Sequence, residues 1–271
     1  MVILACSVLA GLAVLALAIL WINQRKLIYN PDTRRVLPES IGLTGIQERI
    51  LNRPDGVKVV AWYGKAPPHQ PTLLYFHGNG GNLAVRGERI AAYRNSGRGI
   101  YMMSYRGYSG SSGVPTEENN ISDALAAYDD LRELGVQPQD IILYGESLGS
   151  GIAVQVAAQR GVGGIILDAP FTTLADAGKH HYPYLPVDVA LWDRYNSLDK
   201  IVSVKAPLLV VHGKRDNVVP FGQGQQLFAA ANEPKEMVAI PQGGHSNHHL
   251  FGSFHAIQRW LDKVTALSPA E

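Results

Sequence analysis

The hydrophobic pattern of this chain changes period repeatedly, from short apolar runs to stretches in which apolar residues recur at helical spacing. Seven runs have the length and composition of strands: residues 56–64, 71–78, 99–105, 140–145, 163–170, 206–213 and 236–242. Helices are predicted between them, up to about residue 95 and over 117–135, 151–161 and 255–264. Because strands alternate with helices, we expect an α/β fold whose mostly parallel, doubly wound sheet carries helices on both faces.

The flanks of this pattern suggest how the chain is organised. The alternating region spans residues 46–265 and is expected to form one domain. Within it, residues 171–200 contain aromatic residues and prolines but no clear strand, which predicts a short helical cap over the sheet. Residues 23–45 are basic and interrupted by prolines, and they are expected to form a juxtamembrane connector.

The connector is juxtamembrane because the longest apolar run precedes it. Residues 2–22 carry no charge, and as a helix they would extend about 32 Å at ~1.5 Å per residue, close to the ~30 Å of a bilayer core. A cleaved signal peptide is the alternative, since Ala-Leu-Ala at 16–18 could be cut, but no basic segment precedes the run. We therefore expect residues 1–22 to be a retained transmembrane anchor, with the lipid bilayer as partner of residues 2–22.

The basic residues after the span bear on which side of the membrane the domain occupies. Arg25, Lys26, Arg34 and Arg35 all follow the apolar run, and the positive-inside bias would keep the domain in the cytoplasm. The bias weakens for large translocated domains, so an extracytoplasmic domain stays open as the alternative.

Overall composition excludes several kinds of protein. The formal net charge is +1, so no basic field suggests a nucleic-acid partner. The single cysteine, Cys6, excludes a disulfide framework within the chain. Oligomeric state leaves no trace in the sequence.

Candidate chemistry is concentrated where predicted strands end. Ser147 follows the strand at 140–145, Asp216 follows the strand at 206–213, and His245 follows the strand at 236–242. In parallel sheets, ligands bind beyond the carboxyl ends of the strands. These three side chains are therefore expected to meet at one edge of the sheet, together with the glycine-rich loop at 77–82 that follows the strand at 71–78.

The environment of Ser147 distinguishes a nucleophile from an idle serine in a turn. The motif Gly145-Glu146-Ser147-Leu148-Gly149 joins a strand to a helix, and its glycines remove clashes that a strained turn would otherwise create. A serine hydroxyl needs a base to take its proton before it becomes a good nucleophile. A glycine-rich turn alone would be weak evidence, but the ordered aspartate and histidine downstream favour catalysis.

In these motifs the chain resembles the α/β-hydrolase family. G-x-S-x-G after a strand and the chain order Ser, Asp, His are typical of that family, and the resemblance covers roughly residues 46–265. More narrowly, stretches such as LLYFHGNGGN, YRGYSGSSG and HGKRDNVVP resemble a membrane-anchored branch that includes lipid-directed serine hydrolases and protein depalmitoylases. Two residues depart from the expected pattern: Ser104 replaces an acidic residue and Asn120 replaces a glycine.

The resemblance implies a role for each candidate residue. Ser147 would attack an acyl carbonyl, His245 would take and return the proton, and Asp216 would orient the histidine. The backbone N–H groups of Leu148 and Asn79 would form the oxyanion hole. Such a site needs no cofactor and no metal, and its substrate would be a carboxylic ester or thioester carried by a lipid or an acylated protein.

Other residues compete for these roles. His248, His249 and His255 lie farther along the chain than His245, and a metal site among them is disfavoured because no acidic or cysteine ligands cluster nearby. Asp168 ends a strand, where capping of the next segment is the simpler interpretation. A serine peptidase and a non-catalytic membrane-anchored scaffold are the alternative functions.

Overall fold

The computed structural model describes residues 2–266. Its strands are β1 Asn30–Pro31, β2 Gln47–Asn52, β3 Lys58–Gly64, β4 Thr72–Phe76, β5 Gly80–Gly81, β6 Gly99–Met103, β7 Ile141–Glu146, β8 Gly164–Asp168, β9 Leu208–Gly213 and β10 Lys235–Ile240. Its α-helices are α1 Val2–Ile22, α2 Gln24–Ile28, α3 Gly87–Asn95, α4 Glu117–Glu133, α5 Leu148–Ala157, α6 Leu174–His181, α7 Val187–Ala190, α8 Ser197–Ile201, α9 Phe221–Ala230 and α10 Ser253–Ala266.

The main sheet has the strand order β10-β9-β8-β7-β4-β6-β3-β2. All neighbours from β10 to β6 pair in parallel, whereas β3 runs antiparallel to β6 and β2 antiparallel to β3. Phe76 pairs with Gly145, and Glu146 pairs with Asp168, so β4, β7 and β8 end at the same edge. The predicted α/β fold with a mainly parallel sheet is confirmed.

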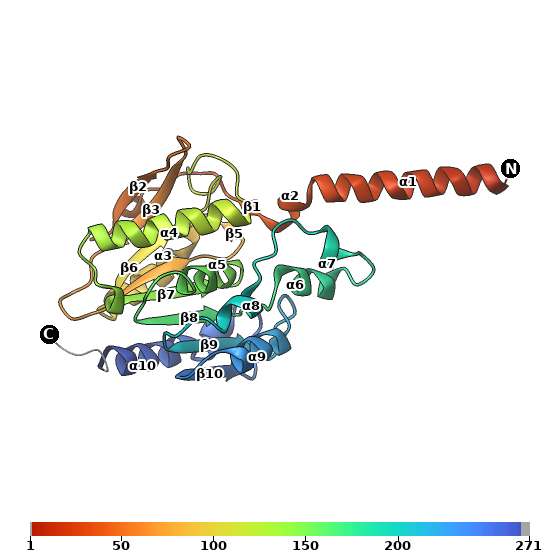
Figure 1. Cartoon of the computed structure of the whole chain (residues 1–271). Coiled ribbons are helices and arrows are strands. Elements are labelled where there is room, and N and C mark those ends of the chain that lie inside the picture. Colours follow the sequence, from red (N-terminus) through yellow and green to blue (C-terminus); the bar gives the residue numbers. More distant parts are fainter. Residues whose placement is uncertain (1, 267–271) are drawn as a thin grey trace.

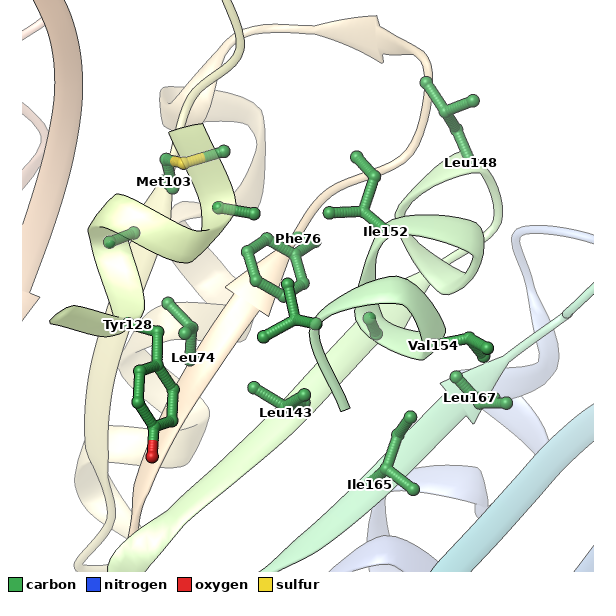
Figure 2. Packing of buried hydrophobic residues seen from close by; sticks show 14 of the residues in the cluster. Leu74, Phe76, Met103, Tyr128, Leu143, Leu148, Ile152, Val154, Ile165 and Leu167 are labelled. Atoms are coloured by element: carbon green, nitrogen blue, oxygen red, sulfur yellow. The ribbon is translucent and has the colours of Figure 1, made fainter. Parts of the chain in front are cut away.

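Helices cover both faces of this sheet, as Figure 1 shows. Side chains of α4, α5, α8 and α9 join one apolar core, and side chains of α3 and α10 join a second core on the opposite face. In Figure 2, Phe76 and Leu143 of the sheet face Ile152 of α5 and Tyr128 of α4. Burial of strands such as β4 on both faces explains why they are continuous apolar runs.

Besides the short elements α2, β1 and β5, two longer elements were not predicted from the pattern. The edge strand β2 has the sequence QERILN, of which only Leu51 is buried, so it lacks the apolar run of a core strand. Helix α9 contains Gly222 and Gly224 and several glutamines, which weaken the helical pattern. Both elements are stabilised by tertiary contacts rather than by local preference.

The N-terminal helix α1 projects away from the sheet, and the side chains that the structure describes in it are exposed (Figure 1). It is long and apolar enough to cross a membrane, by length and composition. The segment that follows is more than a loose tether. Tyr29 is buried in the core, and β1 pairs with β5 in the loop after β4, so residues just after α1 join the folded domain.

Candidate active site

Ser147 lies between β7 and α5 in a turn whose backbone is unusual for a residue with a side chain. Its φ is 51° and its ψ is −114°, and its N–H donates to the carbonyl of Asp168 at 2.8 Å. The glycines on either side of Ser147 are required because a larger residue would clash with the neighbouring backbone. A Cβ at Gly149 would lie 2.0 Å from the carbonyl oxygen of Phe76, and one at Gly145 would lie 2.5 Å from the carbonyl oxygen of Gly149. This packing holds the serine at the amino end of α5.

The structure brings Ser147, Asp216 and His245 into a continuous hydrogen-bonded row. His245 Nε2 lies 2.9 Å from Ser147 Oγ, and His245 Nδ1 lies 2.7 Å from Asp216 Oδ2. A carboxylate can only accept, so Nδ1 carries the proton and Nε2 presents its lone pair to the serine hydroxyl. The other carboxylate oxygen, Asp216 Oδ1, accepts from the N–H groups of Val218 and Val219, each at 2.8 Å.

The environment of Asp216 keeps its carboxyl ionised. Burial would raise its pKa, but hydrogen bonds from His212 and His245 and from the Val219 N–H hold the pKa well below its usual range. His212 was not singled out from the sequence, although it belongs to the HGKRD stretch. Its Nε2 lies 3.3 Å from Asp216 Oδ2 and 3.0 Å from the carbonyl oxygen of Val219, so this buried ring braces the aspartate loop.

The loop after β4 holds the backbone around Asn79 in a fixed orientation. His77 Nδ1 donates to the carbonyl of Gly78 at 2.6 Å, and this carbonyl belongs to the same peptide unit as the Asn79 N–H. The carbonyl of Asn79 accepts from the N–H of Asn30 at 3.0 Å and from the hydroxyl of Tyr108 at 2.7 Å. Burial lowers the pKa of His77 to about 3, so its ring is neutral at physiological pH.

The Leu148 N–H belongs to the first turn of α5, where backbone N–H groups have no partner within the helix. Together with the positive end of the helix dipole, it provides a favourable place for negative charge beside Ser147. The position of Gly149 against Phe76 brings this turn close to the end of β4 and the start of the His77 loop.

A second group of polar side chains lies next to the turn that carries Ser147. Asp168 accepts from Tyr144 Oη at 2.6 Å and lies 2.8 Å from His248 Nε2. Glu146 pairs with Arg89 at 3.1 Å, and Arg89 Nη1 lies 4.0 Å from Asp168. Burial would raise the pKa of Asp168, but His248 and Arg89 lower it to about 2. From the sequence, capping was the simpler interpretation of Asp168, and His248 was a weak competitor of His245. Only the fold reveals that the two form an ion pair.

The remaining predicted positions lie elsewhere. Arg106, in the YRGYSGSSG stretch, pairs with Asp123 and Asp55 at 2.8 and 2.6 Å. His255 lies in α10, away from the row. Among residues 2–266, apart from side chains the structure does not describe, no three His, Cys, Asp or Glu residues are grouped so that they could hold a metal ion.

Several known proteins have sequences similar to this chain. The uncharacterized protein Rv2307c of Mycobacterium tuberculosis is 36% identical, over 97% of this chain and 98% of that protein. The alpha/beta hydrolase domain-containing protein 17B of Homo sapiens is 30% identical, over 73% of this chain and 69% of that protein. The uncharacterized protein YfhR of Escherichia coli K12 is 28% identical, over 80% of this chain and 78% of that protein.

A solved structure and a family profile both match the fold described above. The Pyrococcus furiosus esterase Pf2001 superposes with a TM-score of 0.70 at 18% identity, over 88% of this chain and 98% of that one, which shows a shared fold. A profile of the alpha/beta hydrolase fold matches residues 71–199. With its sheet order, its relatives and this profile taken together, the chain belongs to the α/β-hydrolase family.

Proposed function

We propose that this protein is a membrane-anchored serine hydrolase that cleaves carboxylic esters or thioesters through an acyl-enzyme intermediate. The observation that carries the proposal is the row from Asp216 through His245 to Ser147, with distances of 2.7 and 2.9 Å. Membership in the α/β-hydrolase family and the structural likeness to an esterase support the same reaction class.

In the proposed first step, Ser147 Oγ attacks the acyl carbonyl carbon while its proton passes to His245 Nε2. The resulting tetrahedral oxyanion collapses, the bond to the leaving group breaks, and His245 gives the proton to the departing oxygen or sulfur. In the second step, a water molecule loses a proton to His245 and attacks the acyl-enzyme. Collapse then releases the carboxylic acid and returns the proton to Ser147. Asp216 holds the imidazole in the required tautomer and stabilises its charged form.

The proposed oxyanion hole consists of the backbone N–H groups of Leu148 and Asn79. Support comes from the helix start at Leu148 and from the hydrogen bond of His77 to the Gly78 carbonyl, which fixes the plane of the Asn79 N–H. Loss of one oxyanion donor typically lowers kcat by about 10²–10³. Tyr105, whose hydroxyl donates to the His77 carbonyl at 2.5 Å, would be a positioning residue for this loop.

Residues 2–22 are the proposed bilayer contact, and they suit a substrate whose acyl chain lies in or near the membrane, such as a lipid or an acylated protein. The basic residues after α1 favour a cytoplasmic domain by the positive-inside bias. Protease protection in sealed vesicles measures the side directly.

A fluorophosphonate probe tests the nucleophile. We expect it to label the full-length protein in detergent and to leave Ser147→Ala unlabelled, because the probe reacts with an activated serine hydroxyl. A folded wild-type protein that fails to label would favour a non-catalytic scaffold. A panel of aryl esters of graded chain length, one long-chain acyl thioester and one peptide amide then separates esterase, thioesterase and peptidase activity.

A further inference from the structure

The carboxyl-terminal end of α1 is attached to the cap rather than free of it. The indole ring of Trp21 lies 5.1 Å from that of Trp192 in an edge-to-face contact, and its N–H donates to the carbonyl of Ala190 at 3.1 Å. Gln24 Nε2 donates to the same carbonyl at 3.2 Å, and Gln24 Oε1 accepts from the N–H of Trp192 at 2.8 Å. In Figure 1, α7 accordingly lies beside the end of α1.

A buried polar network extends this attachment into the domain. Arg25 makes two hydrogen bonds with Asp193, at 3.0 and 3.1 Å, and Tyr29 Oη donates to the same carboxylate at 3.0 Å. The hydroxyls of Tyr29 and Tyr195 lie 2.8 Å apart, and Asn120 donates to Tyr195 at 2.8 Å. Asp193 is buried, so its charge depends on these fixed partners. Asn120, the residue that stands where glycine was expected, is therefore part of the attachment.

The cap presents an apolar surface next to this attachment. Residues 182–192, with the sequence YPYLPVDVALW, form what we call the cap loop. Tyr184 is 98% exposed and Val189 is 84% exposed, values unusual for large apolar side chains outside α1. The only charged residue of the cap loop is Asp188, and Lys179 neutralises it at 2.7 Å. Tyrosine and tryptophan are enriched where proteins meet the membrane–water interface.

The length of α1 sets the depth of the cap loop. A helix of 21 residues extends about 32 Å at ~1.5 Å per residue, so it needs its full length to cross a hydrocarbon core of ~30 Å. Trp21, one residue from the end, then lies at the interface. Because Trp21 contacts Ala190 and Trp192, the cap loop lies at the same depth.

We propose that the cap loop is a second membrane contact, with Tyr184, Val189 and Trp192 inserted into the interfacial region of the bilayer that α1 crosses. This inference rests on the membrane anchor of the proposed function. The two contacts together hold the domain in one orientation. His181, which precedes the cap loop, lies 2.8 Å from the carbonyl oxygen of Val218 through Nε2, and Val218 follows Asp216 by two residues. The membrane-facing cap therefore adjoins the edge of the sheet that carries Ser147.

A fluorescence experiment on the full chain in vesicles tests the depth of the cap loop. In a Cys6→Ala background, which removes the only native thiol, the environment-sensitive dye NBD is attached at Tyr184→Cys or at Glu133→Cys. Glu117, in the first turn of α4, accepts a hydrogen bond from the backbone of Arg194 in the cap. Glu133 is exposed at the other end of the same helix, about 24 Å from Glu117 at ~1.5 Å per residue. We expect brominated phosphatidylcholine to quench the dye at 184 at least about twofold and to leave the dye at 133 unchanged.

Each other outcome overturns the proposal, and the outcomes are distinguishable. Equal, weak quenching at both positions in protein that floats with the vesicles would show that the cap loop stays in water. A blue-shifted dye at 184 without bromolipid quenching would indicate a protein partner, such as a second copy of the chain. Protein that fails to float with vesicles would show that residues 2–22 do not anchor the chain in the bilayer. Fluorophosphonate labelling of the same samples tests the hydrolase separately.

A kinetic comparison tests the consequence. We expect Tyr184→Asp combined with Val189→Asp to lower turnover of a long-chain ester embedded in vesicles by about tenfold, because acidic residues are costly at the interface. Turnover of a soluble short-chain ester should not change. Val202→Asp is the matched control, since Val202 is also exposed but lies near the amino ends of the strands, where its carbonyl accepts from Asn232. An equal loss on both substrates, or an equal loss in the control, would contradict the proposal.

Discussion

Two rows of aspartate, histidine and serine lie at the same edge of the sheet: Asp216–His245–Ser147, here the first row, and Asp168–His248–Ser253, here the second row. Their polar contact distances are similar, at 2.7 and 2.9 Å in the first row and 2.8 and 3.0 Å in the second. Both histidines come from the segment after β10. Residue types and distances alone would therefore not separate a reactive site from a structural one.

The environment of the second-row histidine, His248, is one difference. Burial would lower the pKa of His248, but the adjacent Asp168 raises it above its ordinary value. A charged imidazole donates from both nitrogens, so in its charged form, which Asp168 favours, His248 has no lone pair with which to take a proton from Ser253. In the first row, Asp216 accepts from Nδ1 of His245 and leaves Nε2 facing Ser147.

The serines differ as well. Ser253 is buried at the first position of α10, whereas Ser147 is partly exposed in a strained turn at the start of α5. The comparison shows that access and backbone geometry, added to the residue types, distinguish a candidate nucleophile from a structural serine. Four predictions test this difference between the two rows.

The largest expected effect is on activity when each serine is replaced. We expect Ser147→Ala to lower ester turnover by about 10⁴–10⁶, because no nucleophile remains. Ser253→Ala should change kcat by less than about threefold and cost about 1 kcal/mol of unfolding free energy, through the lost hydrogen bond to His248. Steady-state kinetics on a soluble aryl ester measures both. Near-normal turnover of Ser147→Ala would remove the first row from catalysis.

Replacement of the two aspartates should affect different properties, with activity lost at Asp216 and stability lost at Asp168. Asp216→Asn is expected to lower kcat by about 10⁴ by favouring the wrong histidine tautomer. Asp168→Asn should instead lower the free energy of unfolding by about 3–5 kcal/mol, because it removes the buried carboxylate that pairs with His248. Kinetics and urea unfolding of both variants give the comparison. A catalytic loss of about 10⁴ in folded Asp168→Asn would mean that the rows act together.

Glycine at the two serine positions should shift stability in opposite directions. At Ser147, with φ of 51°, glycine relieves a conformation that costs about 1–3 kcal/mol, so Ser147→Gly should be about 1 kcal/mol more stable than Ser147→Ala. At Ser253, glycine should be less stable than alanine by up to about 1 kcal/mol, because the residue is helical. Urea midpoints of the four variants test this. Equal midpoints for Ser147→Gly and Ser147→Ala would argue against strain.

The smallest effect is the pH dependence of stability due to the second row. The pKa of His248 is higher in the folded than in the unfolded protein, so its contribution is complete below about 6.5 and is lost as pH rises through the folded pKa. The pKa of Asp168, lowered to about 2, adds stability above about 4 that is lost as pH falls toward 2. We expect His248→Gln to flatten the decline of unfolding free energy above pH 6.5. Parallel curves for variant and wild type would assign that decline to other groups.

Much of the fold could be predicted from the sequence because buried parallel strands are apolar runs and the helices between them keep a helical period. The edge strand β2 and helix α9 were not predicted because Gln47–Asn52 and Phe221–Ala230 lack those patterns. The segment after α1 looked like a connector because burial of Tyr29 depends on residues more than 160 positions away, Asp193 and Tyr195.

The order of residues is enough to predict that Ser147, Asp216 and His245 follow strands that end at one sheet edge, since parallel strands with helical crossovers must place their carboxyl ends together. Which histidine faces which aspartate depends on how the folded chain packs. His245 and His248 are three residues apart in one segment, and their roles differ because one ring lies in a partly open position against Asp216 and the other is buried against Asp168. Burial and charge pairing between distant segments fix the protonation of a histidine, and no local pattern encodes them.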